Sequence, residues 1–264
     1  MRRGILLATL LLFALGACAA EKAPPPTKAL FVGNSLIYVG NLPATYAALS
    51  TANGHPLQSQ MIVKGGATLD QRVVDGSVQR ALAEQRPQLL ILQEQGGTLL
   101  CWPDESACAK SRAAIKTLAK AGSEVGARVL LLGSYQANPA ASARLMAEEA
   151  AAAEQAGIPY VAVSEALRAA ATAAPALAWY DADGMHPGSA LTLLDAIQLY
   201  RTLHGRLPEH GFPVAAPIYL PKSGLDESLR DANAPAPLAD TPTHIDYPDA
   251  LLQQINALLQ NTQP

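Results

Sequence analysis

Short apolar runs alternate with longer amphipathic stretches over most of the chain. Five runs have the length and residue types of β-strands: 28–33, 58–63, 88–93, 128–133 and 159–164. Between them, hydrophobic positions recur at helical spacing over 42–53, 69–85, 106–125 and 140–156. The strand candidates include stretches that are apolar at every position, which is typical of strands covered on both faces.

Repeated β-α-β units of this kind predict a parallel sheet with helices on both sides. We therefore expect a single α/β domain over 28–264, a three-layer α/β/α sandwich around a mainly parallel five-stranded sheet in flavodoxin-like order. Helices are also expected from 187 to about 204 and over 248–259. The proline-rich segment 205–248 shows no sustained periodicity and is predicted to be irregular.

The first 18 residues have the organisation of an export signal rather than of a structural helix. Two arginines precede an apolar stretch, 5–15, that is too short to span a bilayer. The motif Leu-Gly-Ala-Cys that ends at Cys18 resembles the lipobox of bacterial lipoproteins, which implies lipidation of Cys18 and anchoring in the periplasm or outer membrane. The alternative is an ordinary signal peptide with an incidental cysteine. Residues 19–27 hold three consecutive prolines and predict an extended tether.

Removal of this signal changes the charge of the chain. The 264 residues are 50% hydrophobic and carry a formal charge of −3, and loss of the two arginines leaves 17 basic and 22 acidic residues, or −5. An acidic domain cannot neutralise a phosphate backbone, so a nucleic-acid partner is excluded. Within the alanine-rich stretch 140–156, the adjacent Glu148 and Glu149 are expected to face solvent.

Two cysteines remain outside the lipobox. Cys101 and Cys108 are seven positions apart, and in an exported chain this spacing predicts a disulfide that closes a small loop, with two free thiols as the alternative. Four histidines, His55, His204, His210 and His244, are scattered along the chain without metal-ligand spacing. Neither a metal nor another cofactor is therefore predicted.

Candidate chemistry lies where predicted strands end, because ligands of such sheets bind beyond the carboxyl ends of the strands. The first strand leads into Gly-Asn-Ser at Ser35, and the second into a Gly-Gly-Ala-Thr turn that contains Gly66. A serine becomes a nucleophile when a histidine removes its proton and a carboxylate orients that histidine. Asp183, three residues before His186, could orient it, with Asp181 as a rival. Alternatively, Ser35 belongs to an ordinary turn and Asp183 only caps the next helix.

Together these motifs resemble the SGNH (GDSL-like) family of serine hydrolases, over about residues 28–208. The run Asp-Gly-Met-His-Pro around His186 is the most specific part of the match. The resemblance implies that Ser35 is the nucleophile, His186 the general base and Asp183 its orienting partner. It also implies an oxyanion hole that includes the backbone N–H groups of Ser35 and Gly66.

The third family motif, Gly-x-Asn-Asp, is missing. The corresponding strand ends in Gln93-Glu94-Gln95, so the amide of Gln93 or Gln95 could replace the asparagine that donates to the oxyanion. Alternatively, both glutamines merely close the strand. The loop closed by Cys101 and Cys108 should lie beside this edge, where Trp102 could stack on a sugar, line an acyl pocket or pack locally. Tyr135 and Asn138 follow the fourth strand at the same edge and could contact substrate there.

The resemblance implies a secreted or lipid-anchored ester hydrolase that removes acetyl or other small acyl groups from a glycan or small ester, and we expect a monomer. A lysophospholipase or thioesterase of the same family is an alternative. The missing third motif also keeps open a surface lipoprotein that binds glycan without catalysis. A nucleotide- or flavin-binding sandwich fits the same fold pattern but lacks a phosphate loop.

The lipobox makes a prediction that is independent of enzyme activity. Cys18→Ser removes the thiol that would carry the lipid, so the variant should move from the membrane to the soluble fraction. Fractionation followed by immunoblotting checks this. Continued membrane association would mean that another element holds the protein there.

Overall fold

The computed structural model describes residues 26–260. The predicted signal peptide 1–18, the lipidation site Cys18 and residues 19–25 of the tether lie outside this range. Of the helices within it, none combines the length and the apolar character that crossing a membrane requires.

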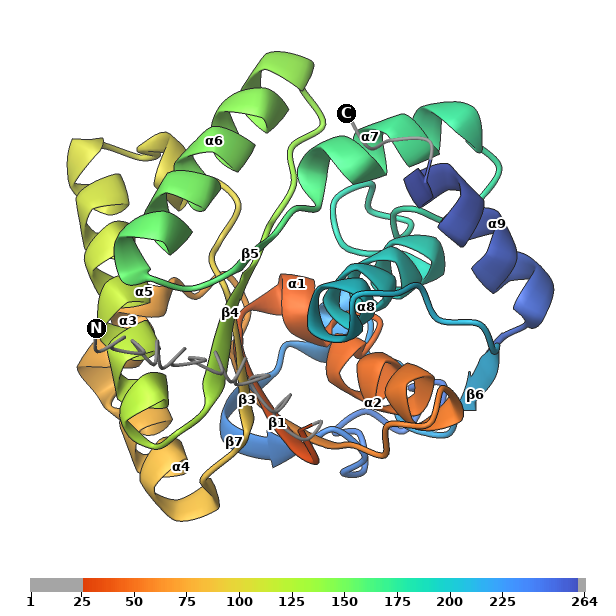
Figure 1. Ribbon diagram of the computed structural model, residues 1–264, viewed down its shortest axis with the longest axis horizontal. Helices are drawn as coiled ribbons and strands as arrows, with labels where there is room; N and C mark the ends of the chain where they lie inside the picture. The colour runs from red at the N-terminus through yellow and green to blue at the C-terminus, as the bar shows by residue number, and fades with distance from the viewer. Residues whose placement is uncertain (1–25, 261–264) are drawn as a thin grey trace, which may run out of the picture.

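The centre of the molecule is a mainly parallel sheet with the strand order β5-β4-β3-β1-β2-β7 (Figure 1). Its parallel strands are β1 (Lys28–Gly33), β2 (Gln58–Lys64), β3 (Leu89–Gln93), β4 (Arg128–Leu132) and β5 (Tyr160–Val161). Their order is that of flavodoxin-like sheets, as expected from the sequence.

Helices cover both faces of this sheet, so the predicted three-layer sandwich is confirmed (Figure 1). One layer contains α3 (Leu69–Asp75), α4 (Ser77–Gln85), α5 (Glu105–Glu124) and α6 (Pro139–Ala156). The other contains α1 (Ser35–Tyr38), α2 (Leu42–Ala52), α7 (Ser164–Ala173), α8 (Ser189–His204) and α9 (Asp249–Gln260). Short 3-10 turns lie at Thr98–Leu100 and Pro221–Ser223.

Alternate strand residues supply the two hydrophobic cores between these layers. Phe31 and Ile91 join the core beneath α2 and α8, whereas Leu30 and Leu90 join the one beneath α5. Because successive side chains of a strand point to opposite faces, a strand buried on both sides must be apolar throughout. This explains the uninterrupted apolar runs of the sequence.

Two predicted elements differ from the structure. The helix expected over 69–85 is two helices, because Gly76 adopts a left-handed conformation (φ +67°) that ends α3 and begins α4. The Asp75 carboxylate accepts a hydrogen bond from Ser77 N–H at 2.8 Å and stabilises the break. The strand expected over 159–164 is reduced to the two residues of β5.

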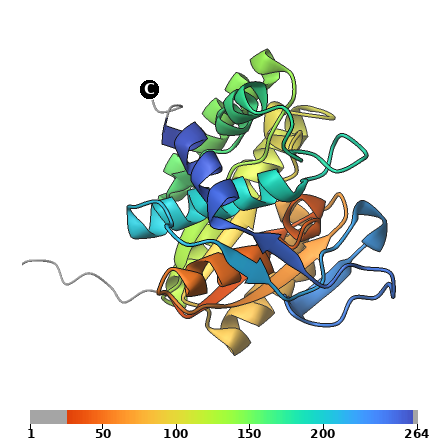
Figure 2. The same ribbon diagram turned by 90° about the vertical axis from the view of Figure 1, so that its right-hand side faces the viewer.

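The segment 205–248, expected to be irregular, contains three short strands: β6 (Phe212–Val214), β7 (Asp226–Asp231) and β8 (Ile245–Tyr247). The strand β7 runs antiparallel to β2 and adds a sixth strand to the five expected. Its pairing includes a salt bridge of 2.7 Å between Asp226 and Lys64. Polar edge strands lack the apolar pattern of central strands, so the sequence pattern did not predict β7. The β6–β8 pair lies outside the α2 and α8 layer (Figure 2).

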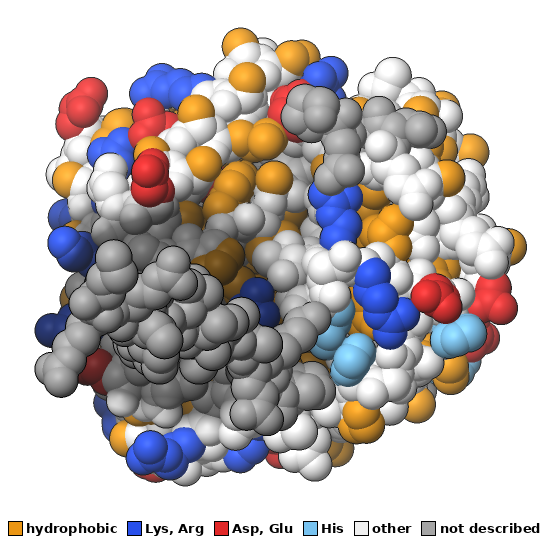
Figure 3. Space-filling model, viewed as in Figure 1, with side chains coloured by type: hydrophobic (Ala, Val, Ile, Leu, Met, Phe, Trp, Pro, Cys, Tyr) orange, Lys and Arg blue, Asp and Glu red, His pale blue; other side chains and the backbone are white. Residues whose placement is uncertain are grey.

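Basic and acidic side chains are interspersed over the face of the molecule seen in Figure 3. Glu148, which was expected to face solvent, is half-buried, and its carboxylate pairs with Arg112 at 2.6 Å. The expectation was wrong for Glu149, which is buried and turned towards the sheet.

Candidate active site

A cavity of about 780 Å³ opens where the carboxyl ends of the parallel strands meet the loop before α8. Six residues singled out in the sequence line it: Ser35, Gly66, Gln95, Trp102, Tyr135 and His186. These residues come from five separate segments of the chain, which the parallel sheet brings to one edge.

Ser35 is the first residue of α1, and the residue before it fixes its position. Asn34 is buried, and its Oδ1 accepts a hydrogen bond from the Leu36 N–H at 3.0 Å as the helix N-cap. Its Nδ2 donates to the Ala67 carbonyl at 3.2 Å. Asn34 therefore ties the serine to the turn that contains Gly66, a bridging role that the sequence did not reveal.

Gly66 occupies the tight turn after β2 in a left-handed conformation (φ +68°). This backbone geometry is strained for residues with a side chain, so glycine allows the turn to close. The Ala67 N–H donates to the Lys64 carbonyl at 3.1 Å across the same turn. The turn thereby brings Gly66 to the cavity beside Ser35.

The imidazole of His186 is held by Asp183. Nδ1 of His186 lies 2.6 Å from Oδ2 of Asp183, while Oδ1 of Asp183 accepts the N–H groups of His186 and Met185 at 3.0 and 2.9 Å. Hydrogen bonds from the backbone and ring of His186, and then from the backbone of Met185, lower the pKa of Asp183 to about 2. An ionised carboxylate at this position favours the tautomer with the proton on Nδ1, which leaves Nε2 as a proton acceptor.

The rival carboxylate has different partners. Oδ1 of Asp181 accepts the Ala182 N–H at 2.7 Å, and the backbone N–H of Asp181 donates to the carbonyl of His186. The Asp181 backbone thus supports the turn, whereas Asp183 orients the ring. Tyr135 also supports this loop, because its hydroxyl donates to the Met185 carbonyl at 2.7 Å.

Ser35 and His186 line the same cavity, and within residues 26–260 no hydrogen bond joins the serine hydroxyl to the imidazole. Catalytic hydrogen bonds are often long in unliganded enzymes and tighten when substrate binds.

The two candidate glutamines occupy different environments. Gln93 is the last residue of β3, is fully buried, and donates from Nε2 to the Gly133 carbonyl at 3.1 Å. Gln95 lies on the following loop and lines the cavity. Its Oε1 is 3.4 Å from the Gly97 N–H, so the amide is held beside the loop backbone. Of the two amides, only that of Gln95 borders the space in front of Ser35.

Two buried carboxylates lie behind the loops that border the cavity. Glu94 accepts hydrogen bonds from the backbone of Leu69 and Gln95, and Glu149 accepts them from Ser134 and from the Tyr160 hydroxyl. Burial raises the pKa of Glu149 to about 7, although its hydrogen bonds act in the opposite direction. The sequence shows both residues only as acidic, and their tertiary partners cannot be read from neighbouring positions.

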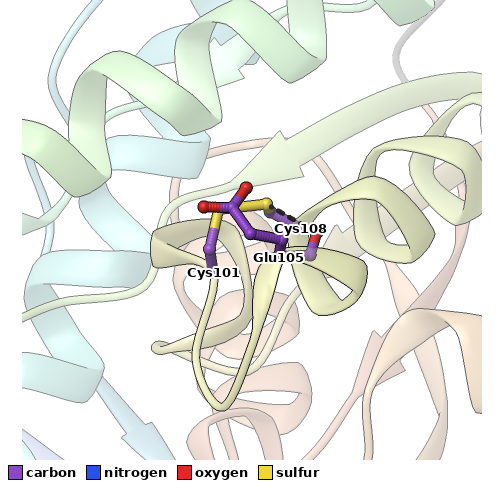
Figure 4. Close-up of side chains that lie close together, drawn as sticks. All are labelled: Cys101, Glu105 and Cys108. Carbon is purple, nitrogen blue, oxygen red and sulfur yellow. Dashed lines mark hydrogen bonds between the residues drawn. A yellow bond between two sulfur atoms is a disulfide. The ribbon is translucent and has the colours of Figure 1, made fainter.

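The predicted disulfide between Cys101 and Cys108 is present and closes the loop after β3 (Figure 4). Glu105 lies beside it, and these three form the one group with metal-ligand proximity among residues 26–260. The two sulfur atoms are bonded to each other and offer no thiolate. The loop carries Trp102 at the rim of the cavity with 64% of its surface exposed.

Tyr135 and Asn138, which follow the fourth strand, have different surroundings in the structure. Tyr135 lines the cavity together with Gln136, which the sequence had not indicated. Asn138 caps α6 instead, with its Oδ1 accepting the N–H groups of Ala140 and Ala141.

The strand order, the cavity at the strand ends and the arrangement of its loops define a protein with the fold of the SGNH hydrolases. No family model and no curated protein sequence matches the chain. Among solved structures, an acetylxylan esterase from Geobacillus stearothermophilus, Axe2, has a TM-score of 0.55 at 16% identity, covering 70% of this chain and 97% of its own.

Two further structures share the fold. TesA has a TM-score of 0.51 at 19% identity, covering 68% of this chain and 99% of its own. A DUF4886 family protein from Bacteroides uniformis has a TM-score of 0.50 at 15% identity, covering 68% of this chain and 83% of its own.

The burial of Glu149 predicts a pH-dependent stability. Its carboxyl binds a proton with a pKa of about 7 in the folded protein, against a usual value of 4.5. Folding is therefore favoured by this group below about pH 4.5, and that contribution is lost as the pH rises to about 7. Glu149→Gln should flatten the dependence of Tm on pH across this window, as measured by thermal unfolding. Glu148→Gln is the matched control and should leave the slope unchanged; equal slopes for wild type and Glu149→Gln would contradict the assignment.

Proposed function

We propose that the protein is a serine ester hydrolase. The observation that carries this proposal is the Asp183–His186 pair, with its 2.6 Å contact, whose histidine lines the same cavity as Ser35. A serine, a histidine free to accept a proton at Nε2 and an ionised carboxylate at Nδ1 are the groups that acyl transfer requires.

In the first step, Nε2 of His186 accepts the proton of Ser35 as Oγ attacks the ester carbonyl. Asp183 stabilises the resulting imidazolium. Collapse of the tetrahedral intermediate breaks the bond to the alcohol oxygen, which takes the proton from His186. Water then attacks the acyl-serine by the same route, releasing the carboxylic acid and restoring Ser35.

The negative charge that develops on the carbonyl oxygen needs donors in front of Ser35. The proposed donors are the backbone N–H groups of Ser35 and Gly66 and the side-chain amide of Gln95. Gln93 is not among the proposed donors, because its amide is buried and donates to the Gly133 carbonyl. Each donor of this kind typically contributes about 100- to 1,000-fold to kcat.

The cavity favours an uncharged ester. Asparagine, glutamine and tyrosine side chains supply its polar lining together with His186, and the residues lining it include no lysine, arginine, aspartate or glutamate. An anionic phosphate group would find no cationic partner there, which argues against a lysophospholipid. Amide groups and an exposed indole suit a carbohydrate, whose hydroxyls form hydrogen bonds and whose ring faces are apolar.

We therefore take acetyl or another small acyl group on a glycan as the substrate. The acetylxylan esterase Axe2, which shares the fold, supports this choice, and two of its structures are catalytic mutants with a serine or an aspartate replaced by alanine. Anchoring through Cys18 in the periplasm or outer membrane is proposed from the sequence motif alone.

The nucleophile is tested with p-nitrophenyl acetate. Ser35→Ala removes the attacking oxygen, so kcat should fall by about 10⁴-fold or more while the thermal unfolding curve stays that of the wild type. Initial rates of release of p-nitrophenol provide the measurement. Activity retained in Ser35→Ala would refute the nucleophile, and an inactive wild type would favour the glycan-binding alternative.

A matched pair of variants controls for general effects on the loop. Asp183→Ala deprives the His186 ring of its partner and should lower kcat about 100- to 10,000-fold. Asp181→Ala leaves that partner in place and should stay within about fivefold of the wild type. The reverse ranking would assign the orienting role to Asp181.

The rim residue Trp102 predicts a difference between substrates. Trp102→Ala should raise KM for an acetylated oligosaccharide about tenfold, because ring stacking contributes roughly 0.5–1.5 kcal/mol, while kcat for p-nitrophenyl acetate stays constant. Val74→Ala removes another exposed hydrophobic side chain, away from the cavity, and serves as the control. Equal KM values for wild type and Trp102→Ala would exclude stacking at this rim.

A further inference from the structure

Glu94 is a charged residue in an almost fully buried position, directly after β3. Its side chain is 1% exposed and does not line the cavity. Burying a carboxylate is costly unless hydrogen bonds replace its hydration. A buried carboxylate of this kind indicates a structural or functional role, and the proposed mechanism gives Glu94 no chemical step.

The carboxylate receives hydrogen bonds from three separate segments. Oε1 accepts from the Leu69 N–H at 3.1 Å and from the Gln95 N–H at 2.8 Å. Oε2 accepts from the Ser111 hydroxyl at 2.7 Å. The donors belong to the first turn of α3, to the loop after β3 and to the middle of α5.

Two of these segments carry proposed oxyanion donors. Leu69 follows Gly66 by three residues at the end of the same turn, and Gln95 is itself the side-chain donor. Asn34 holds the same turn between these two residues, through its hydrogen bond to the Ala67 carbonyl. Glu94 therefore bridges the backbone of the second strand-end loop to that of the third.

We propose that Glu94 is a positioning residue that sets the spacing between the Gly66 N–H and the Gln95 amide in the oxyanion hole. This inference rests on the proposed function. It explains how Gln95 can replace the missing asparagine: the residue before it anchors the loop. Donors act only if they are held where the oxyanion forms, and a displacement of about 1 Å can cost about 100-fold in rate.

The role requires acceptor oxygens and not a negative charge. In Glu94→Gln, the amide oxygen can still accept both backbone N–H groups, and the amide nitrogen can donate to the Ser111 hydroxyl, which accepts as well as donates. In Glu94→Met, a side chain of similar shape offers no acceptor to either loop. The two variants therefore separate positioning by hydrogen bonds from filling of space.

The test measures kcat and KM separately with p-nitrophenyl acetate on the mature protein. Glu94→Met should lower kcat about 10- to 100-fold with KM within about twofold, because the hole acts on the transition state. Glu94→Gln should stay within about threefold of the wild-type kcat. Ser111→Ala, which removes only the contact to α5, is the control and should stay within about twofold.

Three outcomes overturn the inference: a wild-type kcat in Glu94→Met, a loss in Glu94→Gln equal to that in Glu94→Met, or a loss expressed in KM alone. If Glu94→Met fails to fold by circular dichroism, Glu94→Asp takes its place. Its carboxylate is one methylene shorter and cannot reach both loops, so kcat should fall about tenfold. Ser35→Ala separates the two hypotheses, since activity in that variant refutes the proposed function, whereas activity in Glu94→Met refutes only the positioning role.

Discussion

The strands β1, β3 and β4 at the centre of the sheet are apolar on both faces between their ends, and their burial between two helical layers leaves only the ends near solvent. All polar chemistry must then occur on the loops that follow the strands. Ser35, Gly66, Gln95 and Tyr135 each follow a different parallel strand, and the common strand direction brings them to one edge. The loop of His186 completes the arrangement from just before α8.

Hydrogen bonds then connect these loops in a continuous series. Asn34 binds the turn of Gly66, and Glu94 joins the end of that turn to the Gln95 loop. Gln136 donates to the Gly96 carbonyl at 2.7 Å, and Tyr135 beside it reaches the Met185 carbonyl in the loop of His186. The series runs from the segment of Ser35 to the segment of His186 through the Gly66 turn and the Gln95 loop. In the proposed reaction, such preorganisation would reduce the rearrangement needed when charge develops in the transition state.

The sequence predicts the parts of this molecule that depend on local pattern. The central strands are recognisable because burial on two faces demands uninterrupted apolar residues, and Ser35, Asp183 and His186 belong to short motifs. The break at Gly76 was missed because the hydrophobic spacing continues across it. Glu94 and Glu149 could not be assigned, since the groups that donate hydrogen bonds to their carboxylates, apart from the N–H group of the adjacent Gln95, come from segments at least 11 positions away.

The choice between Gln93 and Gln95 depended on where β3 ends. A strand residue faces one core or the other, whereas a residue two positions further on the loop is free to turn towards the cavity. The periodicity of a single sequence leaves strand ends uncertain by more than this distance. Tertiary structure was therefore needed to distinguish two residues of identical chemistry.

The disulfide spans only the loop from Cys101 to Cys108, and neither Ser35 nor the Asp183–His186 pair lies within it. Oxidation therefore cross-links only the loop that carries Trp102, while Ser35 and the Asp183–His186 pair are held by hydrogen bonds of other segments. In a reduced chain those hydrogen bonds would remain available, and only the Trp102 loop would lose its covalent closure.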